Sequence, residues 1–373
     1  MNDVLARVKK AHWDRIVVLD PTDDTPVGLN ALAGTDSPES RAEALLSVFR
    51  SLYGDGLGPR TQDILHSALL TLARRGDASL AMVPLLLTNT GFRRSIVRRI
   101  AAADPVALGP FWAWYEALSD DSRATVISPL QNKLRPLLLN PGLRAVIGQR
   151  QPRITIDQIL AEGKVLLVPL RKQVIGAESS RLLGSLVVAE TWNAIQRRTA
   201  LSPANRPPIL IAIDEVQDYL TLPTDLADAL AQARGLGAGF VLAHQYAAQL
   251  TPVLRAGFLG NIRSRVMFQL AHDDATLLAK GHPELTANDF TALPAFNVYA
   301  SLATKDGQVT PYASGRTLSL SPPISDPDAI RRLSRDRYGR PLDEIEQDLA
   351  EIAQTATEAN TTTGQTGRKR RTS

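Results

Sequence analysis

The stretch PPILIAIDEVQDYL, residues 207 to 220, contains an unbroken apolar run that ends in two adjacent acidic residues, Asp214 and Glu215. Such a run is typical of a β-strand that is buried on both faces, as in a parallel sheet covered by helices. Ligands of parallel α/β sheets bind beyond the carboxyl ends of the strands. The sequence therefore places the two carboxylates at the edge of a sheet where ligands bind.

Four apolar residues followed by Asp-Glu is the pattern of a Walker B strand. In that interpretation Asp214 would hold Mg²⁺, usually through water, and Glu215 would orient and deprotonate the attacking water. The same residue pattern also occurs where a strand simply ends at an acidic helix cap. The pair alone does not decide between the two interpretations.

Strands and helices alternate on both sides of this stretch after residue 150. Strands are predicted within residues 164–170, 208–214, 239–245 and 264–270, and helices within 179–198 and 226–234. Because the strands are continuously apolar, we predict an α/β fold with a mostly parallel sheet flanked by helices.

The remaining segments give the predicted domain organisation. A first strand lies at Ile16 to Leu19, and helical periodicity without a convincing strand follows from about residue 37. FNVYASLATKDGQVTPYASG, residues 296–315, indicates a β-hairpin with its turn at Lys305-Asp306-Gly307. The predicted parts are the first strand of the α/β domain (1–36), an all-helical insertion domain (37–150), the rest of the α/β domain (151–320), a helical extension (321–355) and a disordered basic tail (356–373).

Composition and charge exclude several classes of function. The formal net charge is +4, and the run Arg368, Lys369, Arg370, Arg371 supplies four positive charges, so the rest of the chain sums to zero. Bulk charge therefore does not indicate nucleic acid as a partner. No apolar stretch reaches the roughly 18 residues of a membrane helix, so we expect no membrane insertion by this chain. There is no cysteine, and the histidines lack metal-ligand spacing, so we expect a cytoplasmic protein without a structural metal.

Two further polar residues follow the neighbouring elements. Arg234 ends the helix in QARGLGAGF, and Gln245 ends the next strand in AHQ. An arginine there could act in trans on a phosphate, and the amide could sense the γ-phosphate. Singly, Arg234 could only face its own helix terminus and Gln245 could only cap the following helix. Together with Asp214 and Glu215 on successive strands, they favour a nucleotide hydrolase.

These residues carry a resemblance to a known family. The block ILIAIDEVQDYL to RSRVMFQL, residues 209–270, resembles the C-terminal half of the motor domain of TraG/TraD-type conjugative coupling proteins, within the HerA/FtsK group of hexameric DNA-pumping ATPases. The points of likeness are the Asp-Glu pair, ARGLG, HQ with the later QL, and GNIRSRVMF. A weaker likeness covers most of residues 10–320, including VVLDP near the start.

The resemblance implies a role for each matched residue. Asp214 would be the magnesium ligand, Glu215 the catalytic base, Arg234 an arginine finger that reaches a neighbouring subunit, and Gln245 a sensor of the phosphate state. The family's second basic position, which contacts nucleotide phosphates across the interface, matches Arg263 and Arg265. The resemblance also implies that residues 1–36 and 151–320 form a RecA-like motor domain with ATP and Mg²⁺ as cofactors.

The sequence departs from the family at the phosphate loop. Residues 1–373 contain no G-x-x-x-x-G-K-[ST] string, the loop whose backbone N–H groups and lysine cradle the phosphates. In the family this loop precedes the VVLDP strand. We therefore expect that one strand and the loop are missing, and that this chain alone does not turn over ATP.

Two clusters in the helical segment each have two interpretations. Phe111, Trp112, Trp114 and Tyr115 could stack on bases of single-stranded DNA, although the spacing of Phe111, Trp114 and Tyr115 favours anchoring a helix in the core. Arginines of the 92–100 helix, on the side opposite its apolar residues, could contact DNA phosphates or form a solvated face; they are Arg93, Arg94, Arg98 and Arg99.

The resemblance favours the motor-domain portion of an ATP-driven DNA translocase for type IV secretion. Its implied partners are DNA, a homo-hexamer or intact motor subunits, and membrane secretion-channel proteins, with recruitment to the inner face of the membrane. One alternative is a non-catalytic remnant that acts as an assembly or DNA-contacting module. Another is a HerA-type DNA-processing ATPase.

Overall fold

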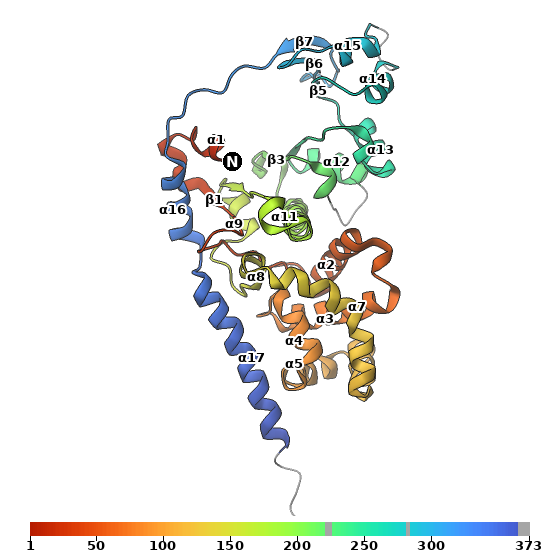
Figure 1. Ribbon diagram of the computed structural model, residues 1–373, viewed down its shortest axis with the longest axis vertical. Coiled ribbons are helices and arrows are strands. Elements are labelled where there is room, and N and C mark those ends of the chain that lie inside the picture. Colours follow the sequence, from red (N-terminus) through yellow and green to blue (C-terminus); the bar gives the residue numbers. More distant parts are fainter. Residues whose placement is uncertain (221–225, 281–283, 365–373) are drawn as a thin grey trace, which may run out of the picture. The chain divides into compact units, whose positions relative to one another are not determined.

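The computed structural model describes residues 1–220, 226–280 and 284–364 (Figure 1). The chain divides into two compact units, residues 1–194 with 324–373, and residues 195–323. This division differs from the predicted domain boundaries, because the helical segment 37–150 shares one hydrophobic core with β-strand and helix residues on both sides of it. We therefore describe each unit by itself.

The first unit is mostly helical, with one pair of strands. Its strands are β1 (Ile16–Val18) and β2 (Val165–Leu167). Its helices are α1 (Asn2–Leu5), α2 (Pro38–Tyr53), α3 (Pro59–Arg75), α4 (Val83–Thr88), α5 (Thr90–Ala103), α6 (Leu108–Ala117), α7 (Asp120–Leu139), α8 (Pro141–Gly148), α9 (Ile156–Ala161), α10 (Lys172–Ile175), α11 (Ala177–Arg197), α16 (Pro327–Tyr338) and α17 (Leu342–Gly364). Residues 38–148 are thus helical, as their periodicity predicts, and no strand is assigned within them.

The amphipathic pattern of α3 shows why these helices form a core. Its apolar residues recur at three- and four-residue spacing, and Ile64, Leu65 and Leu69 are fully buried. The helix begins at Pro59, a position where a missing N–H costs nothing, and ends before Gly76, whose φ of 86° is left-handed. Helix α3 packs against α2, α5 and α7.

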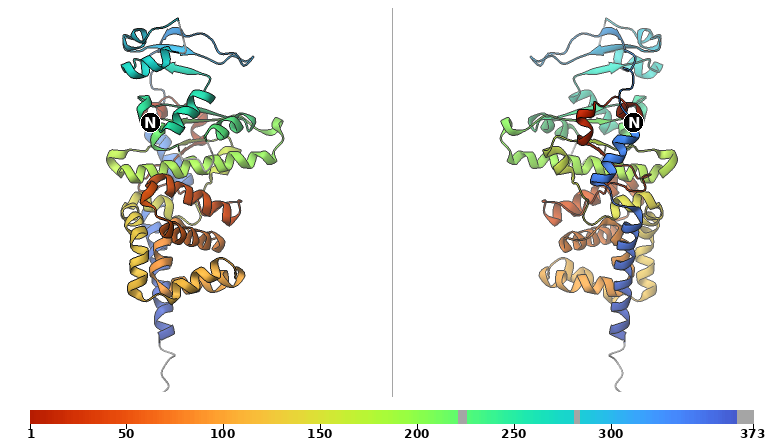
Figure 2. Two further views of the ribbon diagram at one scale, coloured as in Figure 1. Left: turned by 90° about the vertical axis from the view of Figure 1, so that its right-hand side faces the viewer. Right: turned by 90° about the vertical axis from the view of Figure 1, so that its left-hand side faces the viewer.

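The C-terminal helices of the first unit pack against its N-terminal part. Ser334 of α16 is buried and accepts a hydrogen bond of 2.9 Å from the Val18 N–H of β1. Helix α17 runs along α8 and α5 (Figure 2), and Arg144 of α8 pairs with Glu346 at 2.7 Å. The helix continues to Gly364, so residues 356–364 of the predicted disordered tail are helical. The basic run Arg368 to Arg371 lies outside the described residues.

The second unit contains two small sheets. Its strands are β3 (Ile209–Ile213), β4 (Ala238–Leu242), β5 (Arg265–Met267), β6 (Asn297–Ser301) and β7 (Ala313–Arg316). Its helices are α12 (Leu226–Gly235), α13 (Pro252–Asn261), α14 (His272–Ala279) and α15 (Ala287–Thr291). Strands β3 and β4 are parallel, as are β1 and β2 in the first unit, whereas β5, β6 and β7 are antiparallel.

This topology corrects part of the predicted sheet. The strand predicted within 264–270 joins an antiparallel sheet as β5, because its partner is the first strand of the C-terminal hairpin. The hairpin itself is present, with β6 paired to β7. The expectation that all the apolar strands are buried on both faces is also wrong: Leu210 of β3 is 72% exposed and Val241 of β4 is 54% exposed.

No described helix is both long enough and apolar enough to cross a membrane.

Candidate functional site

The candidate site lies in the second unit, at the carboxyl ends of β3 and β4. Ile213, the last residue of β3, is paired in register with Leu242, the last residue of β4. The pairing continues beyond the strands, since the Ala243 N–H donates to the Ile213 carbonyl at 2.9 Å and the Val216 N–H donates to the Ala243 carbonyl at 3.0 Å. The residues that follow each strand therefore emerge at the same edge.

Glu215 adopts a backbone conformation that is unusual for a residue other than glycine. Its φ and ψ are 50° and 51°, in the left-handed region, and a 3₁₀ turn over Val216–Asp218 follows directly. This conformation costs on the order of 1 kcal/mol and is found preferentially at active sites and ligand-binding loops. The Val216 hydrogen bond to Ala243 holds the turn in place.

Two glutamines hold the Glu215 carboxylate. The Gln245 side-chain amide donates to Oε1, and the Gln217 amide donates to Oε2 at 2.6 Å. An ionised carboxylate accepts through both oxygens, so the two amide donors fix the orientation of the Glu215 carboxylate. The structure thus brings Glu215 and Gln245 together across the strands. Sequence reasoning missed Gln217, although its place two residues after the acid, inside a tight turn, was the available signal.

Asp214 is exposed at the same edge. One of its carboxylate oxygens, Oδ1, accepts the Glu215 N–H at 3.0 Å. Magnesium keeps several waters and takes only one or two carboxylates together with substrate phosphates. No group of three or more histidine, aspartate or glutamate side chains suited to a metal is found in the described part of the chain. A single exposed carboxylate at a sheet edge fits magnesium held in this open manner.

The segment after β4 is fixed by two further side chains. Gln249 accepts the backbone N–H groups of Gln245 and Tyr246 through its Oε1, at 3.3 and 3.4 Å. Asp274 of α14 accepts the Ala247 N–H at 2.8 Å. These contacts set the position from which the Gln245 side chain reaches Glu215.

Arg234 lies at the other end of the β3–β4 pair. It precedes the start of β4 by four residues, and five strand residues extend about 16 Å, so it is at the opposite edge from Glu215. The carbonyl of Gly235, at the C-terminus of α12, accepts Arg206 at 2.8 Å. The Arg234 side chain is exposed and makes no hydrogen bond or ion pair within residues 1–220, 226–280 and 284–364.

Arg263 and Arg265 belong to the antiparallel sheet. Arg263 donates to the Gly307 carbonyl in the hairpin turn at 3.2 Å, and Arg265 donates to the Leu259 carbonyl of α13 at 3.0 Å. No hydrogen bond or ion pair joins either of them to Asp214 or Glu215 in the described structure. The predicted set therefore divides into a joined group, Asp214, Glu215 and Gln245, and three separate arginines.

Comparisons with known proteins show which fold the chain shares. No family model matches the chain, and no curated protein matches it. Among solved structures, the unbound form of the bacterial conjugative coupling protein TrwBdeltaN70 aligns with a TM-score of 0.54 at 15% identity, covering 86% of this chain and 77% of that one. The chain has the fold of a TraG/TraD-type conjugative coupling protein.

Two nucleotide complexes of TrwB share this coupling-protein fold. The complex with ADP and Mg²⁺ aligns with a TM-score of 0.53 at 16% identity, over 86% of this chain and 77% of that one. The complex with the non-hydrolysable ATP analogue ADPNP aligns with a TM-score of 0.53 at 15% identity, over 81% and 74%. At these identities the likeness concerns the fold.

Proposed function

We propose that the chain is the motor-domain portion of an ATP-driven DNA translocase. The observation that carries the proposal is the Glu215 carboxylate, held through both oxygens by Gln217 and Gln245 at the carboxyl edge of a parallel strand pair, next to the exposed Asp214. This is the arrangement needed to orient a water and take its proton. The coupling-protein fold supports the same assignment.

Each residue at the edge has one role in the proposed chemistry. Asp214 holds Mg²⁺, and bound magnesium would neutralise charge on the triphosphate. Glu215 accepts the proton of the attacking water through a carboxylate oxygen. Gln245 couples the position of Glu215 to the segment after β4, so that a change at the phosphate can be transmitted to β4 and α14.

Arg234 acts in trans in this proposal. Its exposed position at the opposite edge from Glu215 suits a contact with the nucleotide of a neighbouring subunit, within a homo-hexamer or with intact motor subunits. Arg263 and Arg265 would contact nucleotide phosphates across the same interface. DNA and membrane secretion-channel proteins are the proposed further partners, as the fold relationship suggests.

The phosphate loop must come from outside residues 1–373, because no G-x-x-x-x-G-K-[ST] string lies within them. We therefore expect no ATP turnover by this stretch of chain alone. The absent string also favours a second function, a non-catalytic assembly or DNA-contacting module. A HerA-type DNA-processing ATPase would use the same edge.

The test is ATP hydrolysis by a form in which a phosphate-loop segment is joined ahead of residue 1. We expect magnesium-dependent hydrolysis that DNA stimulates, and a loss of about 100-fold in Asp214→Ala. Asp306→Ala, which removes an exposed carboxylate in the hairpin turn, is the matched control and should retain activity. Undiminished activity in Asp214→Ala contradicts the metal assignment. DNA binding without any hydrolysis supports the second function.

A further inference from the structure

The aromatic cluster of α6 leaves one ring on the surface. Trp112 and Tyr115 are 1% and 0% exposed, whereas Trp114 is 38% exposed. Core anchoring through Trp114 is therefore wrong: Trp112 enters the core in its place and donates its indole N–H to the Thr71 hydroxyl at 2.9 Å. Trp114 lines an open hollow of about 420 Å³ between the start of α3, α6 and α7.

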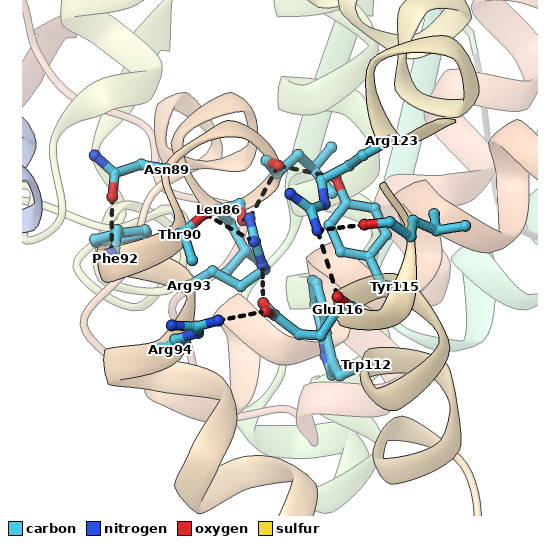
Figure 3. Close-up of polar contacts among 12 residues, drawn as sticks. Leu86, Asn89, Thr90, Phe92, Arg93, Arg94, Trp112, Tyr115, Glu116 and Arg123 are labelled. Carbon is cyan, nitrogen blue, oxygen red and sulfur yellow. Dashed lines mark hydrogen bonds and ion pairs between the residues drawn. The ribbon is translucent and has the colours of Figure 1, made fainter. Parts of the chain in front are cut away.

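The helix that carries Trp114 is held by polar contacts on its other side (Figure 3). The hydroxyl of Tyr115 donates to the Leu87 carbonyl at 2.8 Å, and Glu116 pairs with the fully buried Arg93. Arg123 of α7 donates to the Leu118 carbonyl at 2.9 Å, and its guanidinium lies 5.6 Å from the Tyr115 ring centroid. These contacts fix α6 against α5 and α7, so the Trp114 ring is presented on a rigid support.

The other residues around the hollow supply a cation and hydroxyl groups. The side chain of Arg60, at the first turn of α3, is exposed and has no hydrogen bond or ion pair in the part of the chain that the structure describes. Asp121, Ser122 and Thr125 line the side formed by α7, where the Ser122 hydroxyl is hydrogen-bonded to the Ser119 hydroxyl at 2.9 Å and the Thr125 hydroxyl donates to the Asp121 carbonyl at 2.8 Å. A carboxylate repels phosphate but accepts hydrogen bonds from base amino groups. A phosphate therefore fits beside Arg60, and a base fits between Trp114 and α7.

A second cation lies along the same helix. Lys133 follows Ser122, which lines the hollow, by eleven residues, about 16 Å along α7 and on nearly the same side. Its ammonium lies 5.6 Å from the ring centroid of Tyr53, next to the connection that leads into α3. The segment 37–150 carries 14 Lys and Arg against 9 Asp and Glu, a net charge of +5, whereas the whole chain carries +4.

We propose that this hollow binds single-stranded nucleic acid, with one unpaired base stacked on Trp114, its phosphate on Arg60 and a further phosphate on Lys133. Stacking needs a base that is free of a duplex, which selects a single strand over double-stranded DNA. The two cations, Arg60 and Lys133, favour a polyanion over a neutral peptide. The site lies in the first unit, and its binding needs neither nucleotide hydrolysis nor Glu215.

The test is fluorescence anisotropy of a labelled single-stranded oligonucleotide titrated with the full chain at low salt, without ATP. Stacking of one base is worth about 1–3 kcal/mol, so Trp114→Ala should weaken binding by about five-fold or more, and Trp114→Phe should restore most of it. Arg60→Ala should weaken binding and lower the slope against log salt by about one. Arg135→Ala, two residues from Lys133 and on another side of α7, removes the same charge and should change affinity less than two-fold.

The affinity of the wild-type protein for altered oligonucleotides provides an independent measurement. Wild-type protein should bind an oligonucleotide with abasic positions, or a duplex of the same length, about five-fold or more weakly than the intact single strand. Equal affinity for these ligands overturns the proposal. Equal loss in Arg135→Ala and Arg60→Ala, or wild-type affinity in Trp114→Ala, also overturns it. Binding of peptides without binding of any oligonucleotide also overturns the proposal, because the hollow would then be a peptide site.

Discussion

Asp20 and Asp214 each come just after an apolar strand of a parallel pair, yet their surroundings are opposite. Asp20 is 1% exposed and accepts Arg171, Arg331 and the Thr22 hydroxyl, whereas Asp214 is exposed. The strands differ in the same way, since all of β1 is buried while β3 alternates between covered and exposed residues. The same sequence signal thus produces a structural acid in one unit and an available acid in the other.

The largest expected difference is in the free energy of unfolding, between alanine variants of one leucine near each acid. Leu19 is 1% exposed, and Leu19→Ala should lower the free energy of unfolding by about 3 kcal/mol through lost burial and a cavity. Leu210 is 72% exposed, so Leu210→Ala should change it by about 0.5 kcal/mol or less. Urea unfolding of both variants measures the contrast. Equal losses would mean that the exposed face of β3 is covered in solution.

Replacing the acids themselves should give a smaller difference in the free energy of unfolding, and this difference should depend on pH. Burial alone would raise the pKa of Asp20, but hydrogen bonds from Thr22 and the Arg171 guanidinium outweigh it and hold that pKa below its ordinary value. Asp20→Asn should therefore cost about 2 kcal/mol at pH 7, because the charge-assisted bonds of this buried carboxylate to Arg171 and Arg331 are lost. Since the folded-state pKa is lowered, this difference should be complete above about pH 5 and should shrink as the pH falls through the folded-state pKa.

Asp214→Asn is the comparison variant for Asp20→Asn. Its free energy of unfolding at pH 7 should stay within about 0.5 kcal/mol of wild type, because the replaced side chain is exposed. Asp120→Asn, at a side chain 98% exposed, controls for removing a carboxylate from the first unit. A similar stability loss in all three variants would show that general charge, and not the contacts of Asp20, sets the pH dependence.

Periodicity and strand ends predicted much of the fold and part of the site. The helices of residues 38–148, the hairpin, and the approach of Gln245 to Glu215 follow from spacing and from the rule that parallel strands present their carboxyl ends together. The coupling-protein fold follows from the motif residues of the 209–270 block.

The failures have local causes that spacing does not contain. Four aromatic residues lie within five positions of α6 and point to all sides of the helix, so periodicity does not predict which ring is buried. Trp112 is buried, where its indole N–H finds an acceptor in the Thr71 hydroxyl of α3. Arg93 is predicted to lie on a solvated face with Arg94, but Glu116 and the Leu87 carbonyl satisfy its guanidinium inside the helical core. The antiparallel place of β5 depends on where the chain returns after α15.

The most direct measurement of the central claim is ATP hydrolysis by Glu215→Gln in the form that carries a phosphate-loop segment ahead of residue 1. The substitution keeps the size of the side chain and removes its ability to accept a proton. We predict a loss of about 100-fold or more in turnover with nucleotide binding retained, while Asp306→Asn stays active. Wild-type turnover in Glu215→Gln would contradict the account, because the edge of β3 and β4 would then not be where hydrolysis occurs.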